Sequence, residues 1–394
     1  MAEISGIYAR EILDARGIPA IEAEVELDTG IIGRASVPSG GNTRTDGDPA
    51  RYAGRGALSA VENIEKIIRP ELAGMDAFDQ IGIDRTLIDA DGTPDRSDPG
   101  ANVLCAVSLA CAHAAAAELK LPLYRYLGGV NAKVLPVPQF TAADGPSGRF
   151  MIRPIGADCF AEALKMSYSV LGAFAKTAGT ALPPHDEIPG LLVSAIEKAG
   201  LVPGRDMTIA LACAAGDFFK EGMYDFRSAG DPREECRSPE QQAAYLADLV
   251  EKFSIDTLED PMAPGDRDGW RLLARAVGDK CRLAGNKLFS SDLKRLKKDF
   301  SSGTANAILI RPVQAGTVTE TLDLAGTARR NGLAVIIGRS PGETEDCSVA
   351  DLSVAVNADS FEAGPLAGSE NICKCNQFLR IEEQLGLLAG FGSL

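Results

Sequence analysis

The sequence contains no uninterrupted apolar run near the roughly 20 residues that a membrane-spanning helix needs, and its N-terminus has no basic region followed by an apolar block. A basic excess is also missing, because 40 Lys and Arg face 55 Asp and Glu, for a formal net charge of −15. These absences argue against a membrane partner and against a nucleic-acid partner. They predict a cytoplasmic protein.

A disulfide framework is not indicated by the cysteines, which number nine and are scattered through apolar stretches. Cys373 and Cys375 form the only close pair in the sequence. Their spacing of one intervening residue is not that of a zinc or redox motif, and no second pair exists. We therefore interpret the cysteines as small core residues.

The residues that are present indicate a globular protein, since 45% of the 394 are hydrophobic and 24% are charged. Residues 21–37 alternate apolar and polar side chains around Asp28-Thr29-Gly30, which predicts a β-hairpin. Residues 101–119 are rich in Ala and Leu and predict a buried helix, with His113 as a packing residue. We expect an α+β unit over roughly the first 125 residues.

Beyond Gly129, short β-branched runs alternate with amphipathic helical windows. The runs cover residues 207–213, 256–262, 281–288, 307–313 and 333–339. No Gly-x-Gly-x-x-Gly loop follows a strand, so the alternation favours a barrel of parallel strands over an open sheet. We expect any active site at the carboxyl ends of these strands. Residues 183–190 interrupt the pattern and predict a loop.

The residues that follow the predicted strands are mainly cationic or neutral. They are Ala212, Glu259-Asp260, Asn286-Lys287, Arg311 and Gly338-Arg339-Ser340. One carboxylate beside Ala212 and Asn286 is a poor donor set for Mg²⁺. Arg311, Arg339 and Lys374 instead suit a phosphorylated or dicarboxylate small molecule. Equally, the arginines can be structural ion-pair partners of Glu259, Asp260 or Glu343.

Motifs in order along the whole chain resemble those of enolase, the phosphopyruvate hydratase family. They include AREILDARGIPAIEAEVEL, GRASVPSGGNT, LPLYRYLGG, FMIRPIGA, LEDP, ILIRPVQAGTVTET, GRSPGET and CNQFLRIEEQLG. The resemblance implies an N-terminal α+β domain over 1–130 and an eight-stranded β/α barrel over 131–394, with an antiparallel start. It also implies a homodimer, because Glu22 and Arg380 match an intersubunit ion pair of the family.

Five positions match the family's functional residues. Glu259 matches a Mg²⁺ ligand, Arg339 and Ser340 match the phosphate clamp, Lys374 matches the lysine that contacts the substrate carboxylate, and Ser39 matches a mobile-loop serine. These matches imply that the end of the site that binds anions is retained.

Other functional positions depart from the family pattern. Two metal carboxylates are replaced by Ala212 and Asn286, the base lysine by Arg311, a histidine by Gly338 and a glutamate by Arg149. An arginine stays protonated near pH 7 and is a poor general base. A histidine-bearing loop is shortened to residues 142–148, and the general-acid loop looks deleted near 181–184, although Asp186-Glu187 offers an alternative alignment.

The resemblance with these departures implies a re-purposed site that binds a small phosphorylated or phosphono carboxylate. Ordinary dehydration of 2-phosphoglycerate is expected to be absent or very weak, and Mg²⁺ binding weak or absent. The alternative is a noncatalytic pseudo-enolase that acts by dimerising or by binding a partner protein.

Overall fold

The computed structural model describes residues 2–38, 47–93, 96, 98, 100–179, 183–229 and 235–392. The chain begins with an antiparallel sheet of β1 (Ile4–Leu13), β2 (Pro19–Leu27) and β3 (Ile32–Val37). β2 and β3 form the predicted hairpin, in which Ile21 pairs with Val37. The sequence analysis did not identify β1, which pairs antiparallel with β2 on the side opposite β3.

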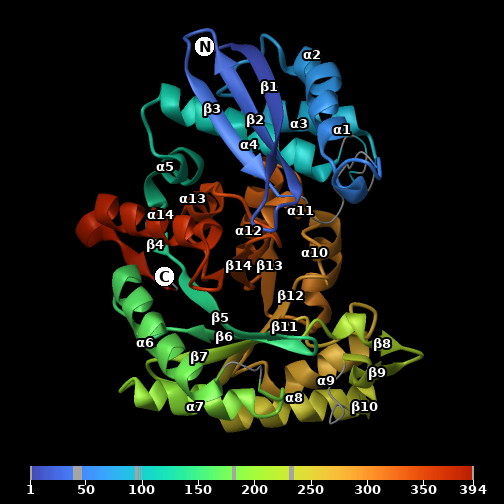
Figure 1. The fold of residues 1–394 in the computed structure, drawn as a ribbon, viewed down its shortest axis with the longest axis vertical. Helices are drawn as coiled ribbons and strands as arrows, with labels where there is room; N and C mark the ends of the chain where they lie inside the picture. Colours follow the sequence, from blue (N-terminus) through green and yellow to red (C-terminus); the bar gives the residue numbers. More distant parts are fainter. Residues whose placement is uncertain are drawn as a thin grey trace.

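Helices pack on this sheet to complete the N-terminal unit (Figure 1). They are α1 (Leu58–Asn63), α2 (Arg69–Leu72), α3 (Gln80–Asp91), α4 (Ala101–Glu118) and α5 (Leu123–Gly128). The predicted buried helix is α4, and Gly33 of β3 allows it to approach the sheet closely. A Cβ on Gly33 would lie 2.2 Å from the carbonyl oxygen of Ala110. By length and composition α4 could cross a membrane, but 83% of it is buried, as in a core helix of a globular protein.

The rest of the chain forms a closed eight-stranded barrel, as the sequence predicts. Its strands are β5 (Val137–Gly145), β6 (Gly148–Arg153), β7 (Thr208–Ala212), β11 (Ile255–Glu259), β12 (Arg282–Gly285), β13 (Ala307–Ile310), β14 (Ala334–Gly338) and β15 (Ser360–Gly364). β6 runs antiparallel to both neighbours, so the barrel is not all parallel but has the antiparallel start that the resemblance implies.

Helices surround the barrel (Figure 1). They are α6 (Phe160–Ala178), α7 (Ile188–Lys198), α8 (Pro239–Phe253), α9 (Arg267–Val277), α10 (Leu293–Asp299), α11 (Pro312–Ala315), α12 (Val318–Arg330), α13 (Ser348–Ala355) and α14 (Ser369–Leu385). The start of α8 shows how the sequence sets such boundaries, since Ser238 and Gln241 form a capping box ahead of Pro239.

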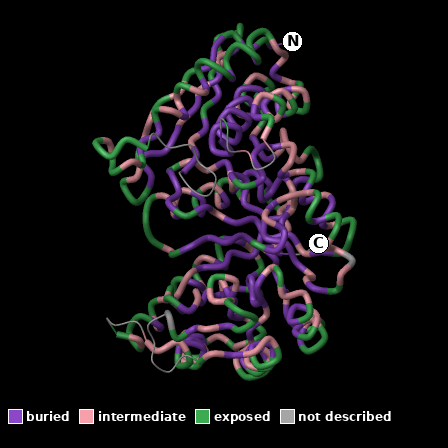
Figure 2. Tube along the Cα trace, turned by 90° about the vertical axis from the view of Figure 1, so that its right-hand side faces the viewer, coloured by how far each residue is buried: buried purple, intermediate pink, exposed green. Residues whose placement is uncertain are grey.

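Short strands complete the described fold. β4 (Val134–Leu135) pairs with β16 (Gly390–Phe391), and β8 (Phe219–Lys220), β9 (Met223–Asp225) and β10 (Cys236–Arg237) form a small sheet. Figure 2 shows buried segments running through the interior of both parts of the molecule, with exposed segments on the outside. Separate apolar clusters fill the N-terminal unit and the space between the barrel strands and their helices.

Two expected loops are partly regular structure. Residues 142–148 belong mostly to the hairpin of β5 and β6, because these strands extend to Gly145 and restart at Gly148. In the predicted loop over 183–190, α7 already begins at Ile188, with Glu187 as its N-cap. Asp186-Glu187 therefore lies at a helix start. Part of the proposed deletion near 181–184 lies outside the described residues.

Candidate functional site

The strand ends identified in the sequence are strand ends in the structure, and they meet at one mouth of the barrel. β7 ends at Ala212, β11 at Glu259 and β14 at Gly338, while Arg311 directly follows β13. The antiparallel β6 brings its first residues to the same mouth, where Arg149 pairs with Ala212. Residues from distant parts of the sequence thus surround one space.

Two arginines and two glutamates lie together inside the barrel mouth, and we call Arg149, Glu259, Arg311 and Glu362 the barrel cluster. Arg311 Nη2 lies 2.8 Å from Glu362 Oε2 and 3.4 Å from Glu259 Oε1. Arg149 forms an ion pair with Glu362, and its Nη2 lies 4.0 Å from Glu259 Oε2. All but Arg149 are buried. The two guanidiniums thus share two carboxylates in a largely buried part of the barrel.

Gly338 provides the space for this arrangement. A Cβ on Gly338 would lie 3.0 Å from Glu362 Oε2, 3.2 Å from Arg311 Nη1 and 2.8 Å from Leu309 Cδ2. A side chain at this position would force Leu309 to move and would press against the Arg311–Glu362 ion pair. The glycine and the ion pair therefore depend on each other.

The protonation states of the barrel cluster follow from burial and mutual charge. Burial lowers the pKa of Arg311, but nearby Glu362 and Glu259 outweigh it and raise the pKa above its ordinary value. Burial raises the pKa of Glu362, but Arg311, Arg149 and Arg339 outweigh it and hold the pKa low. Burial and the charge of Glu362 raise the pKa of Glu259 to about 7, against the opposing effect of Arg311. Arg311 therefore carries no free electron pair for proton abstraction.

The groups that surround Glu259 are not suitable ligands for a divalent cation. The amide nitrogen of Asn286 donates to Glu259 Oε1 at 3.0 Å, and Arg311 approaches the same oxygen. Asp260 is occupied in accepting backbone N–H groups of Asn286 and Lys287 at 2.9 Å. Among the described residues, no group of three or more His, Cys, Asp or Glu is arranged to hold a metal ion. A Mg²⁺ ion prefers several oxygen ligands, whereas Glu259 faces N–H donors.

A cavity of about 440 Å³ opens next to the barrel cluster, and we call it the mouth cavity. Its polar walls come from Arg16, Asp144, Arg149, Arg311, Arg339, Glu343, Glu362, Glu370 and Asn371. The lining is mixed in charge, so the expected cations Arg311 and Arg339 lie among carboxylates. The volume lies within the range of small-molecule sites.

Arg339 differs from the other arginines of the mouth cavity. Within the described parts of the chain it forms no ion pair, and its buried Nε has no hydrogen-bond partner. Burial lowers the pKa of Arg339, and the charges of Glu362 and Glu343 only partly offset this. Gly364 makes room for the guanidinium, since a Cβ there would lie 2.3 Å from Arg339 Nε. Arg311 is therefore paired with carboxylates within the protein, as one of the two interpretations of the sequence expected. Arg339 has no such partner among the described residues.

The other expected anion contacts lie near the mouth cavity and already have partners. The Lys374 ammonium lies 3.0 Å from Glu343 Oε2 and donates to the carbonyl of Thr344 at 2.7 Å. The backbone N–H of Ser340 donates to Glu343 Oε1 at 2.6 Å. Glu343 thus holds both groups together. Ser39 lies outside the described residues.

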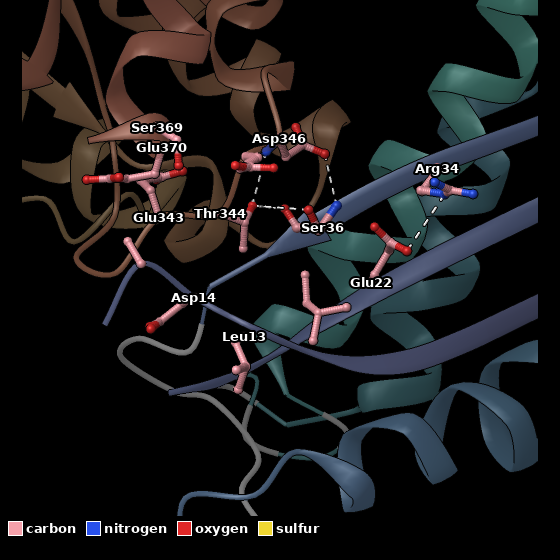
Figure 3. Close-up of a pocket in the computed structure, with 13 residues that line it drawn as sticks. Leu13, Asp14, Glu22, Arg34, Ser36, Glu343, Thr344, Asp346, Ser369 and Glu370 are labelled. Atoms are coloured by element: carbon pink, nitrogen blue, oxygen red, sulfur yellow. Dashed lines mark hydrogen bonds and ion pairs between the residues drawn. The ribbon is translucent and has the colours of Figure 1, made fainter. Parts of the chain in front are cut away.

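The loop after β14 also contacts the N-terminal sheet. Ser36 of β3 donates its N–H to Asp346 Oδ2 at 2.9 Å, and its hydroxyl donates to Thr344 Oγ1 at 3.1 Å (Figure 3). A second cavity of about 440 Å³ lies between Asp14 and Glu22 on the N-terminal side and this loop. The loop is therefore fixed between the two parts of the molecule.

Glu362 is a central site residue that the sequence analysis missed. It lies in β15, whose five residues are all buried, and it contacts both arginines of the barrel cluster. The sequence carried one signal for it, a glutamate within a short apolar run. A buried carboxylate requires charged or hydrogen-bonding partners, so such a glutamate indicates a buried polar contact.

Comparison with protein families identifies both parts of the chain. The family model described as "Enolase, N-terminal domain" matches residues 4–127, and the one described as "Enolase, C-terminal TIM barrel domain" matches residues 132–393. The chain belongs to the enolase family. Two members of the barrel cluster of this enolase-family protein, Glu259 and Arg311, are the residues that the resemblance matches to a metal ligand and to the catalytic base.

Proposed function

We propose that this enolase-family protein binds a small phosphorylated or phosphono carboxylate in the mouth cavity without using a metal ion. The observation that carries the proposal is Arg339, which is half-buried, has a buried Nε without a hydrogen-bond partner, and has no ion-pair partner among the described residues. Even partial burial of an unpaired charge is costly, and a bound anion would neutralise it. Arginine also offers a two-pronged contact that matches phosphate and carboxylate geometry.

The local charge balance supports an anionic ligand. Arg149, Arg311 and Arg339 provide three positive charges against two carboxylates, Glu259 and Glu362. Because the pKa of Glu259 is raised to about 7, part of its negative charge is also missing near neutral pH. The whole lining of the mouth cavity has four arginines and four carboxylates, so the positive excess is local to Arg149, Arg311 and Arg339. An anion is favoured at that end of the cavity. The guanidiniums would supply the charge that a metal provides in ordinary relatives.

Ordinary 2-phosphoglycerate dehydration is not expected from this site. Arg311 occupies the position of the base and stays protonated, so no neutral amine removes the proton next to the carboxylate. Loss of a general base costs about 10²–10⁴ in rate, and loss of metal stabilisation costs several kcal/mol more. Binding is therefore proposed without this turnover.

Isothermal titration in a chelating buffer tests the proposed function. Phosphoenolpyruvate, phosphonopyruvate and 2-phosphoglycerate are the probes, and at least one of them should bind below millimolar concentration. Arg339→Ala should weaken binding about tenfold or more, because it removes charged hydrogen bonds. Arg205→Ala, which removes an exposed arginine paired with Asp206, is the matched control and should bind like the wild type. Absence of binding for all three probes would rule the proposal out.

A second candidate function is a noncatalytic partner-binding protein. The observation that favours it is that most charged side chains of the site already pair with one another, in the barrel cluster and in the Lys374–Glu343 ion pair. The double variant Arg311→Ala plus Arg339→Ala separates the two functions. It should abolish anion binding in the first case and leave association with a partner unchanged in the second.

A homodimer through Glu22 and Arg380 remains part of both proposals. Within the chain Glu22 already pairs with Arg10 and lies 3.7 Å from Arg34, while Arg380 is exposed and donates to Gln377 at 3.3 Å. An exposed arginine with only a weak internal contact is available to a partner subunit. Size-exclusion chromatography with light scattering should give a dimer at micromolar protein, and a monomer would contradict the proposal.

A further inference from the structure

Glu343 occupies two hydrogen-bond donors that lie behind the wall of the mouth cavity. Its Oε2 lies 3.0 Å from Lys374 Nζ, and its Oε1 accepts the backbone N–H of Ser340 at 2.6 Å. Glu343 lines the mouth cavity, whereas Lys374 and Ser340 do not. A carboxylate of the protein itself therefore separates the space for a ligand from an ammonium group and a backbone N–H.

The contacts of this carboxylate are those that an anionic ligand would make. An ammonium group at one oxygen and an N–H group at the other are strong partners for a carboxylate or a phosphate. Lys374 is only 1% exposed, and it also donates to the carbonyl of Thr344 at 2.7 Å. A buried ammonium needs an anionic partner, and among the described residues Glu343 is the one carboxylate that pairs with it. An anion that contacts Lys374 therefore has to replace Glu343.

The backbone of Glu343 is held in place by the N-terminal unit. Its carbonyl oxygen accepts the N–H of Ala15 at 2.9 Å. The preceding Gly342 has a φ of 71° and lies close to Arg16, since a Cβ on this glycine would lie 2.3 Å from Arg16 Nε. Displacement of the Glu343 carboxylate is therefore a rotation of its side chain, with the loop in place.

The second cavity provides the space for this rotation. Glu343 lines both the mouth cavity and the second cavity, and Figure 3 shows it among the residues around the latter. The other carboxylates around the second cavity are those of Asp14, Glu22, Glu345, Asp346 and Glu370, and Arg34 is the one basic residue among the described residues there. Like charges oppose the entry of a further carboxylate. Without a ligand, Glu343 therefore stays in contact with Lys374.

We propose that Glu343 is an internal competitor of the anionic ligand and limits the affinity of the mouth cavity for it. A phosphate or carboxylate group of the ligand takes over the contacts with Lys374 Nζ and the Ser340 N–H, and the Glu343 carboxylate rotates toward the second cavity. No covalent bond forms or breaks in this exchange. The inference rests on the proposed anion binding and adds the residue that opposes it.

Isothermal titration of the full-length protein with phosphoenolpyruvate in a chelating buffer tests this inference. Glu343→Ala removes the competing carboxylate and should bind the probe about tenfold more tightly than the wild type, because the ligand meets an ammonium group without a partner. Glu343→Gln keeps the shape of the side chain without its charge, and it should raise the affinity by a smaller factor. Circular dichroism at the titration temperature verifies that each variant is folded.

Two further variants separate competition from a general effect of charge or structure. Glu251→Ala is the matched control, because Glu251 also pairs with a lysine, Lys280, but on the exposed surface. This variant should bind the probe like the wild type. The double variant Glu343→Ala plus Lys374→Met should lose the gain in affinity, because the released ammonium group is missing. A gain that persists in the double variant would overturn the inference.

The outcomes also separate this inference from the proposed function. Binding by the wild type with no gain in either Glu343 variant would overturn the inference and leave the proposed anion binding intact. Binding by the Glu343 variants alone would support the inference and show that the competitor prevents binding in the wild type. Absence of binding in all of these proteins would overturn both.

Discussion

Arg311 Nη2 lies 2.8 Å from Glu362 Oε2 inside the barrel, and Gly338 leaves the space in which the two side chains meet. Three strands supply these residues, because Arg311 follows β13, Gly338 ends β14 and Glu362 lies in β15. The ion pair places a permanent positive charge at the position that the resemblance assigns to a proton acceptor. Charge complementarity, and not proton transfer, is therefore the chemistry that this site offers.

Glu362→Gln should destabilise the fold, because it leaves the buried Arg311 and the half-buried Arg149 with only Glu259 as a carboxylate partner. Breaking a buried ion pair by removing one partner costs about 3–5 kcal/mol. Urea unfolding measures this loss. Glu383→Gln, which changes an exposed glutamate, is the control and should stay within about 0.5 kcal/mol of the wild type. Equal stability of both variants would mean that Glu362 does not balance the arginines.

Gly338→Ala should destabilise the protein although it adds only a methyl group. The new Cβ would lie 2.8 Å from Leu309 Cδ2 and 3.0 Å from Glu362 Oε2, so these side chains must move. Overpacking of this kind costs about 1–3 kcal/mol. The same substitution at Gly172 in α6 meets no atom within 4 Å and should be neutral or stabilising. Thermal unfolding of both variants gives the comparison, and a neutral Gly338→Ala would refute the steric argument.

The buried Asp351 should make stability fall as the pH rises through the weakly acidic range. Burial raises its pKa from 3.8 to about 6, despite hydrogen bonds from the Tyr124 N–H and Gln377. The folded state therefore holds a proton that the unfolded state releases. This contribution to stability is complete below about pH 4 and is lost as the pH rises to about 6.

Asp351→Asn removes this titration and tests the sign. The fall in unfolding midpoint between about pH 4 and pH 6 should be smaller in the variant, although Glu259, whose pKa is also raised, still contributes to it. At pH 7 the variant should equal or exceed the wild type. Asp248→Asn, at an exposed carboxylate on α8, should leave the wild-type profile unchanged. A wild-type profile that rises over this interval, or an unchanged slope in Asp351→Asn, would show that Asp351 is not the group responsible.

Arg311→Lys should not restore dehydration of 2-phosphoglycerate. A lysine at this position would face the same Glu362 and Glu259, and these carboxylates favour the protonated amine. The absorbance of the enol product measures turnover in the presence of Mg²⁺. Both the wild type and the variant should remain at background. Turnover by the variant alone would show that the identity of this one side chain, and not the whole cluster, prevents the reaction.

Much of the architecture could be predicted because its signals are local. The hairpin of β2 and β3 follows from alternation around Asp28-Thr29-Gly30, and α4 follows from its apolar composition. β1 was missed because the sequence around Tyr8 mixes apolar and charged residues in a strand that is half exposed. The hairpin of β5 and β6 was missed because Pro and Gly near its turn resemble a loop.

The site was predicted in part, for a different physical reason. The predicted strand ends place Glu259 and Arg311 in the site from sequence alone. The ion-pair partners of these residues depend on which strands become neighbours when the barrel closes. Glu362 comes from the middle of β15 and reaches Arg149 only because β15 lies beside β5, whose hairpin partner β6 carries Arg149. The sequence likewise cannot show that Arg311 has an ion-pair partner whereas Arg339 has none among the described residues, because this depends on the three-dimensional arrangement.

Titration of phosphoenolpyruvate with and without Mg²⁺ tests most directly whether guanidiniums have taken over the role of metal ions at this site. Isothermal titration in a chelating buffer and in millimolar magnesium chloride should give the same dissociation constant for the wild type, and Arg339→Ala should weaken binding equally in both. Binding that appears only when magnesium is added, and that survives the loss of Arg339, would contradict the account.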